Sequence, residues 1–273
     1  MAQQINLIDL DDLTDLSKLP VQAGFEIDQP FERKLEHTIR HVKGLLRSGT
    51  AIAASTSGGK DSACMVAVVL EAARQLVEAG EPCADIRFMS SRTKLDNPEV
   101  DQHLLKDHQE LTAFIEKHNL PAKALMTEPS YTEDYLVQIL AGRIIPSTPM
   151  TNHKCAVMMK VGPLERLRSK VFNDELAAYA WENVIVTTGK RMTESKHREL
   201  EMRKNGEVPW EAKEINGRLM LPPIAHWTID DVWTFIGQVT NGRFKTYSDF
   251  HRLMEVYRAG NGGLCGVLVH EGK

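Results

Sequence analysis

The stretch from Ser57 to Ser62 reads Ser-Gly-Gly-Lys-Asp-Ser, and its residue types are suited to holding an anion. Gly58 and Gly59 can adopt backbone angles closed to other residues and let a ligand approach the main chain. The serine hydroxyls at both ends can donate hydrogen bonds, and Lys60 adds a positive charge. These residue types in this order predict a phosphate-binding loop, called the glycine loop below.

The flanking residues place this loop between a strand and a helix. The apolar run from 50 to 56 predicts a buried strand, and the periodicity from 60 to 78 predicts a helix that ends at Gly80. A helix N-terminus attracts anions through its unpaired N–H groups and its dipole. Ser55 and Thr56 close the strand with two more hydroxyls. We expect Asp61, an acid among anion-binding groups, to recruit Mg²⁺ or to order the loop by hydrogen bonds.

Two common nucleotide-binding motifs do not describe this loop. A Walker A loop requires Gly, four residues, then Gly-Lys-Ser/Thr, whereas Asp61 follows Gly59-Lys60 here and Ala54 stands where the first glycine should be. The dinucleotide pattern GxGxxG is also absent from this position. A serine-glycine turn at a capped helix is the structural alternative to a phosphate loop.

A second group of candidate ligands follows the strand predicted from 183 to 189. Gly189 allows the chain to turn out of that strand, and Arg191 and Arg198 carry fork-shaped donors suited to phosphate or sulfate oxygens. Ser195 can donate from a helix N-terminus. A charged, solvent-facing helix start is the alternative interpretation. Because parallel strands end at one edge of a sheet, we expect these residues beside the glycine loop.

Strand and helix patterns alternate along the chain. Further strands are predicted at 85–90, 122–127 and 218–221, and helices at 32–46, 99–118, 132–140, 161–180, 193–204 and 229–238, the last with Thr228 as its N-cap. This alternation predicts an α/β fold, a doubly wound and mainly parallel sheet with helices on both faces. We expect an N-terminal arm (1–30), a nucleotide-binding domain (31–240) and a C-terminal tail (241–273).

Composition favours a soluble cytoplasmic protein. The 273 residues are 42% hydrophobic, carry a formal net charge of -4 and have a pI near 6.2, so no global positive field points to nucleic acid or to a membrane surface. The acidic N-terminus lacks a signal pattern, and no apolar run is long enough to span a bilayer. The four cysteines form no CxxC pair, which favours reduced thiols over a disulfide framework.

The glycine loop resembles the SGGxDS pyrophosphate loop of the adenine nucleotide α-hydrolase superfamily, whose members cleave ATP between the α and β phosphates. Residues 189–198 resemble the GxRxxES-x-x-R segment of the PAPS reductase-like family within it. Residues 90–100, the loop with Lys154, Cys155 and Lys160, and residues 221–233 also resemble family segments. The likeness extends from about 51 to 233. Its Ser-Ser turn and Asn-Pro pair look closest to the ATP pyrophosphatase of bacterial DNA phosphorothioation.

The cysteines separate this chain from both relatives. Classical PAPS reductases carry a C-terminal Glu-Cys-Gly-Leu-His segment, but here Cys265 lies in Leu-Cys-Gly without an adjacent histidine. An iron-sulfur cluster normally needs four cysteines, and only Cys155 and Cys265 are plausible ligands, so we expect no cluster in this chain alone. Cys155, beside Lys154, is either a reactive thiol or structural, and Cys265 is either a sulfur carrier or idle. We expect Cys64 to pack in the core and Cys83 to have no role.

Two activities and one non-catalytic role follow from the resemblance. The first is an ATP pyrophosphatase with Mg²⁺, in which Lys60, Asp61 and Arg191 act on the phosphates and the acceptor is DNA, tRNA or a protein. A desulfurase or thioredoxin-like protein would then be the sulfur donor. The second is a PAPS or APS reductase that forms a thiosulfonate on Cys265. The third is an ATP-binding subunit of a larger complex.

Overall fold

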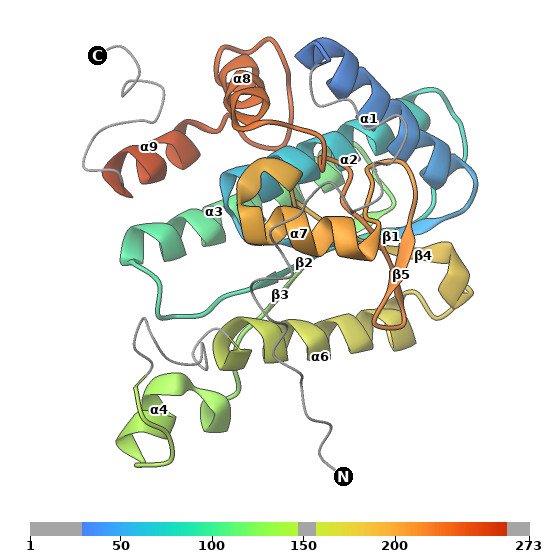
Figure 1. Ribbon diagram of the computed structural model, residues 1–273. Coiled ribbons are helices and arrows are strands. Elements are labelled where there is room, and N and C mark those ends of the chain that lie inside the picture. Colours follow the sequence, from blue (N-terminus) through green and yellow to red (C-terminus); the bar gives the residue numbers. More distant parts are fainter. Residues whose placement is uncertain (1–28, 147–156, 261–273) are drawn as a thin grey trace.

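The computed structural model describes residues 29–146 and 157–260, which form a six-stranded, mainly parallel sheet (Figure 1). The strand order is β3-β2-β1-β4-β6-β5, and only the β5–β6 pair is antiparallel among the described strands. The bounds are β1 Ala51–Thr56, β2 Ile86–Ser91, β3 Ala122–Thr127, β4 Val184–Thr188, β5 Lys213–Ile215 and β6 Arg218–Leu221. The predicted fold class is confirmed.

Helices cover both faces of this sheet (Figure 1). Their bounds are α1 Phe31–Arg47, α2 Lys60–Glu78, α3 Pro98–Lys117, α4 Tyr135–Leu140, α6 Gly162–Lys170, α7 Lys196–Asn205, α8 Ile229–Thr240 and α9 His251–Gly260. The α1, α2 and α3 side holds the larger apolar cluster, and α6 packs against β2 and β3 on the other side. Within the described residues, no helix is long and apolar enough to cross a membrane.

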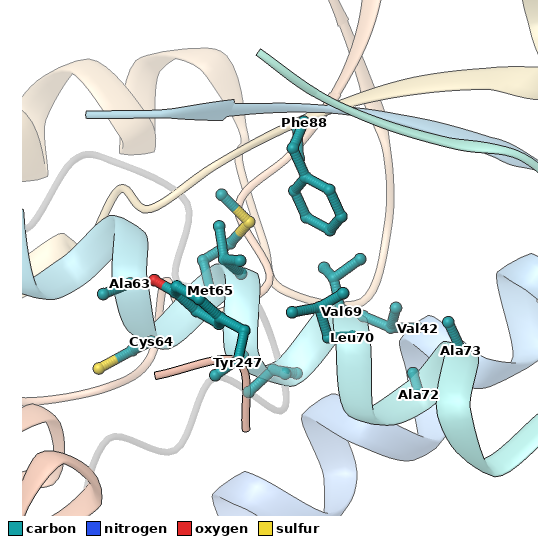
Figure 2. Packing of buried hydrophobic residues seen from close by; sticks show 14 of the residues in the cluster. Val42, Ala63, Cys64, Met65, Val69, Leu70, Ala72, Ala73, Phe88 and Tyr247 are labelled. Carbon is teal, nitrogen blue, oxygen red and sulfur yellow. The ribbon is translucent and has the colours of Figure 1, made fainter. Parts of the chain in front are cut away.

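Strand β1 shows why both faces must be covered. Its residues alternate between the two cores: Ile52 and Ala54 lie in the cluster with α2, whereas Ala51 and Ala53 lie in the cluster on the α6 side. Side chains of a strand alternate between faces, so a strand with four apolar residues in a row needs a partner layer on each side. Figure 2 shows Phe88 of β2 above the buried face of α2.

Helix α8 is joined to α1 by a buried ion pair. The Lys34 ammonium lies 2.6 Å from Oδ2 of Asp231, and the two side chains are 1% and 11% exposed. Asp231 also accepts a hydrogen bond from the backbone N–H of Thr228, whose hydroxyl accepts one from the Asp231 N–H. This capping box confirms Thr228 as the N-cap, and it connects the helix start to α1.

Several parts of the chain differ from the sequence-based expectations. The helix predicted over 161–180 is α6 only to Lys170 and then widens into a π-turn over Val171–Glu175. That turn brings Val171 and Leu176, five residues apart, into the same apolar cluster, which a regular α-helix does not do. Sequence reasoning also missed β5 and α9. Helix α9 packs on α3, and the predicted domain boundary at residue 240 stays a prediction.

Asp107 makes the stability of this fold dependent on pH. It is 5% exposed on α3, and burial raises its pKa to about 7, against roughly 4 in an unfolded chain. A folded-state pKa above the unfolded one gives stability that is fully present below pH 4 and is lost as the pH rises through 7. Asp107→Asn should therefore flatten this decline. The unfolding free energy of the variant minus that of wild type should increase by on the order of 2–4 kcal/mol from pH 4 to pH 8.

Urea denaturation at the two pH values measures this difference, with Asp174→Asn, an exposed carboxylate, as the matched control. A difference between Asp107→Asn and wild type that is the same at both pH values would contradict the assignment.

Candidate functional site

The site lies where the strand order changes direction. The chain adds β2 and then β3 on one side of β1, and it returns to place β4 on the other side. The segments that follow β1 and β4 therefore leave neighbouring parallel strands at the same edge, with Ser55 opposite Thr188 in the register. In open α/β sheets this switch point is where ligands bind. The glycine loop follows β1, and the second group of candidate residues follows β4.

Gly189 lies directly against the first turn of α2. A Cβ atom at this position would lie 2.8 Å from the carbonyl carbon and oxygen of Asp61 and from the backbone nitrogen of Ser62. Those atoms are backbone and cannot turn aside, so only glycine fits without moving the helix. The contact sets the distance between the segment after β4 and the glycine loop.

Hydrogen bonds within the glycine loop fix its shape. The Ser62 hydroxyl donates to the Gly59 carbonyl at 2.9 Å and lies 3.1 Å from the Ser57 hydroxyl. Gly58 has a φ of +69°, a backbone conformation that residues other than glycine rarely adopt. Its carbonyl oxygen lies 3.0 Å from Nε2 of His103 on α3. Burial lowers the pKa of His103, so a neutral imidazole donates to this carbonyl. Helix α3 thus supports the loop from behind.

The start of α2 receives no hydrogen bond from a side chain of its own N-cap residue. Its N-cap residue is Gly59, which offers no side-chain oxygen to the first N–H groups of the helix. Ser55 Oγ and Thr56 Oγ1 are buried and have no hydrogen-bond partner among the described residues. Open helical amides beside unpaired hydroxyls fit a ligand with many acceptor oxygens, such as a polyphosphate.

Asp61 connects the two segments by charge. Its Oδ1 lies 2.5 Å from Nε of Arg191, and its Oδ2 lies 3.0 Å from the ammonium of Lys60. Arg191 is 2% exposed and also donates to the Thr193 hydroxyl at 3.0 Å. Of the two roles expected for Asp61, this geometry supports the ordering of the loop.

A cavity of about 390 Å³ opens between the two segments, and we call it the glycine-loop cavity. It brings together eight of the predicted site residues: Ser55, Ser57, Gly59, Lys60, Asp61, Ser62, Gly189 and Arg198. Thr188, Lys190, Glu194 and Tyr257 complete its lining. Arg198 reaches the cavity from α7, where Glu201 accepts a hydrogen bond from its guanidinium at 3.0 Å.

Other predicted residues do not line this cavity. Thr56 and Gly58 shape the loop from outside it, and Arg191 lies behind Asp61. Ser195 was expected to donate to a ligand. Instead its side chain caps α7 and accepts a hydrogen bond from the Arg198 N–H at 3.1 Å. A serine before a helix satisfies the backbone N–H groups of its own first turn, which keeps it from a ligand.

The cysteines fall into two groups. Cys64 is fully buried in the core, where burial raises its pKa and keeps the thiol protonated, so its predicted packing role is confirmed. Burial raises the pKa of Cys83 to about 11. Cys155 and Cys265, together with Lys154, lie outside the described residues, so their predicted roles stay predictions.

Lys160 is exposed, one residue after Met159, whose carbonyl accepts a hydrogen bond from the Ser91 hydroxyl at 3.0 Å.

Four residues of the cavity lining were not among the predicted site residues: Thr188, Lys190, Glu194 and Tyr257. Lys190 lies inside the segment already singled out, and its ammonium is 3.4 Å from both carboxylate oxygens of Glu207, whose side chain is 1% exposed. A lysine directly after the strand-ending glycine was an available signal. Tyr257 comes from α9, 197 residues away from Lys60, and nothing local in the sequence indicates its position.

Tyr257 covers the start of α2. The backbone N–H of Lys60 donates to its hydroxyl at 3.1 Å, and the Lys60 ammonium lies 5.3 Å from the ring centroid. Trp233 holds the ring edge-on at 5.7 Å. The hydroxyl oxygen therefore occupies the place at the Lys60 amide that a phosphate oxygen would take.

The donor set for a metal ion is small. Among residues 29–146 and 157–260 there is no group of three or more His, Cys, Asp or Glu side chains that could hold one. Asp61 offers a single carboxylate, and both its oxygens face cations. Mg²⁺ typically takes one or two protein carboxylates and completes its shell with phosphate oxygens and water. An ion that arrives with a nucleotide would meet the carboxylates of Asp61 and Glu194 in this lining, and the role of Asp61 as a metal ligand stays a prediction.

A mainly parallel α/β sheet with a glycine-rich loop at its switch point defines the chain as an open α/β protein, a class whose ligands bind at strand ends. A model of the phosphoadenosine phosphosulfate reductase domain matches residues 51–241, and the chain belongs to this family. The predicted PAPS reductase resemblance is confirmed to that extent. A comparison with curated proteins found no match.

Two solved structures resemble the chain at low identity. NAD+ synthetase from Burkholderia pseudomallei is 15% identical with a TM-score of 0.44, covering 78% of this chain and 76% of that one. Candida glabrata FMN adenylyltransferase, in complex with FMN and the ATP analog AMPCPP, is 13% identical with a TM-score of 0.40. That match covers 82% of this chain and 62% of the other. Likenesses at this level say nothing about substrate or residue roles.

Gly189→Ala tests the contact between the two segments. The added methyl group must push α2 or the segment after β4 away, because its neighbours are backbone atoms. We expect a loss of about 1–3 kcal/mol in unfolding free energy and at least about tenfold weaker ATP binding, measured by urea denaturation and calorimetry. Gly237→Ala in α8 is the control, since its Cβ would meet nothing within 4 Å. Wild-type affinity in Gly189→Ala would show that the spacing is not critical.

Tyr257→Phe tests the hydroxyl at the Lys60 amide. A phosphate oxygen must replace this hydroxyl to reach the amide, so removing it should tighten binding of a non-hydrolysable ATP analogue by roughly three- to tenfold. Calorimetry measures the change, and Tyr131→Phe, an exposed tyrosine, is the control. Weaker binding by Tyr257→Phe would instead make the hydroxyl a donor to the ligand.

Proposed function

We propose that this protein is an ATP pyrophosphatase, which cleaves ATP at the α-β phosphate bond and releases pyrophosphate. The observation that carries the proposal is the glycine-loop cavity, where uncapped amides at the start of α2 meet the cations of Lys60, Lys190 and Arg198. Membership in the PAPS reductase domain family adds support, since its members are enzymes that act on adenine nucleotides.

The β and γ phosphates would bind in the glycine loop. Their oxygens would accept from the first amides of α2 and from the hydroxyls of Ser55 and Ser57, and Lys60 would balance part of the charge. Lys190 and Arg198 line the opposite wall, close to where the α phosphate would follow. Charge that develops on the phosphates during attack would be stabilised by groups already in place.

Asp61 and Arg191 would act as positioning residues. Their ion pair joins the glycine loop to the segment after β4, and it holds the Lys60 side chain through the second oxygen of Asp61. Asp61 would hold Mg²⁺, and the bound ion would supply positive charge that favours pyrophosphate as the leaving group.

The acceptor that attacks the α phosphate would be another molecule. A nucleic acid or a partner protein would supply the nucleophile, and AMP would be transferred or released. A sulfur-transfer pathway, with a desulfurase or thioredoxin-like donor and a DNA or tRNA acceptor, is the setting that the family resemblance suggests.

A PAPS or APS reductase is the second candidate, and the family model is the observation that favours it. The same loop would then hold the phosphate end of the nucleotide. The Cys265 thiolate would attack the sulfate sulfur, form a thiosulfonate and release the adenosine phosphate. A thioredoxin-like dithiol would then reduce the adduct and release sulfite, becoming a disulfide.

Product analysis separates these activities. Magnesium-dependent formation of AMP and pyrophosphate from ATP supports the first proposal. Sulfite release from PAPS with thioredoxin, lost in Cys265→Ser, supports the second and overturns the first. Tight ATP binding with neither product overturns both and leaves an ATP-binding subunit.

Asp61→Ala and Ser62→Ala test the roles of the loop residues. Each should reduce pyrophosphate release by at least about 100-fold, because one loses the ion pair with Arg191 and the other loses a loop hydroxyl. Thermal melts should show folded protein in both cases, and Asp174→Ala is the acidic surface control. Full activity in both variants would remove the glycine loop from the mechanism.

A further inference from the structure

A second cavity, of about 700 Å³, lies between α1 and the segment that follows α7. Its lining includes His37, His41, Trp210 and His226, and no described residue lines both this cavity and the glycine-loop cavity. We call it the histidine cavity. Its volume falls in the range of sites that bind small ligands, about 300–1,000 Å³.

Among the described residues that line the histidine cavity, four carry aromatic rings and none is acidic. Three imidazoles and the Trp210 indole present flat rings, and Leu45 and Pro209 add apolar surface. Rings of this kind bind other rings by stacking, and stacking on an aromatic side chain suits any nucleobase.

His226 adds a specific demand for a donor. It is 8% exposed, and its Nδ1 atom has no hydrogen-bond partner among the described residues. Burial lowers the pKa of His226 to about 4, so the ring is neutral, and a hydrogen bond to the Lys34 backbone opposes that shift. In the neutral tautomer that carries its proton on Nε2, Nδ1 is a buried acceptor that faces no donor among the described residues.

Two more groups define the ligand. The Nε2 atom of His41 is also buried without a partner in the described structure, and burial lowers the pKa of this ring. Arg40, one residue before it, adds an exposed guanidinium to the lining, paired on the surface with Glu36. A planar ligand with an N–H donor on its ring edge and a negatively charged substituent would satisfy these groups together.

We propose that the histidine cavity binds a nucleoside monophosphate unit, with the base among the imidazoles and Trp210, an amine of the base on His226 Nδ1, and the phosphate at Arg40. The unit is a free nucleotide or one residue of a single strand, since both present the same chemistry. This site is separate from the proposed ATP site and does not depend on its activity.

Photolabelling of the full chain with 8-azidoadenosine 5′-monophosphate tests the site. Trypsin releases Trp210 in the peptide Asn205–Lys213 and the glycine loop in the peptide Ser48–Lys60, so the two sites are read separately. We expect label on Asn205–Lys213. Arg40→Ala should reduce it by about fivefold and leave any label on Ser48–Lys60 unchanged, whereas Arg33→Ala, exposed on the same helix, should change neither.

Competition identifies the ligand. AMP should displace the label about tenfold better than purine riboside 5′-monophosphate, which lacks the amine, and ribose 5-phosphate should not compete. Displacement by AMP and by single-stranded oligoadenylate supports a free nucleotide or a strand, and displacement by the oligonucleotide alone assigns a strand. No label on Asn205–Lys213, or equal competition by ribose 5-phosphate, would overturn the proposal. Label on Ser48–Lys60 alone would overturn it while leaving the proposed ATP site intact.

Discussion

The contact between Gly189 and the first turn of α2 is the constraint on which the candidate site depends. Two backbones meet there, one leaving β4 and one beginning α2, with no room for a Cβ. The Asp61–Arg191 ion pair crosses the same junction. Together the contact and the ion pair fix the relative position of the two loops. The two residues of the ion pair are 130 positions apart in the sequence. A site assembled from separate loops binds well only if their spacing is preset, because each ångström of freedom costs binding energy.

The cationic side chains around this junction have two different roles. Arg191 is buried and its charge is balanced by Asp61, so it shapes the site, whereas Lys60, Lys190 and Arg198 line the cavity. Lys190 is held in turn by Glu207, an almost fully buried acid at the end of α7. Cations that already have carboxylate partners remain ordered without a ligand, and they still have N–H donors to offer to phosphate oxygens.

The elements that support the site are helices packed in the apolar cluster on the α2 side of the sheet. Helix α3 contributes His103 behind Gly58, and α9 brings Tyr257 to the Lys60 amide. The ion pair of Lys34 with Asp231 ties α1 to α8, and α1 also forms one wall of the histidine cavity. The segment from 205 to 210 contributes to both cavities. Glu207 forms an ion pair with Lys190 of the glycine-loop cavity, and Trp210 lines the histidine cavity.

The sequence by itself determined the strand-loop-helix units, the class of fold and the glycine loop, because these follow from apolar periodicity and from residue types that are neighbours in the chain. It also placed Gly189 and Arg198 near that loop through the rule for parallel strands. Only the tertiary structure decided that Ser195 caps α7, that Arg191 lies behind Asp61, and that Tyr257 and the histidine cavity exist. Those features depend on distances between segments far apart in the chain, and such distances are set by packing, which no local pattern encodes.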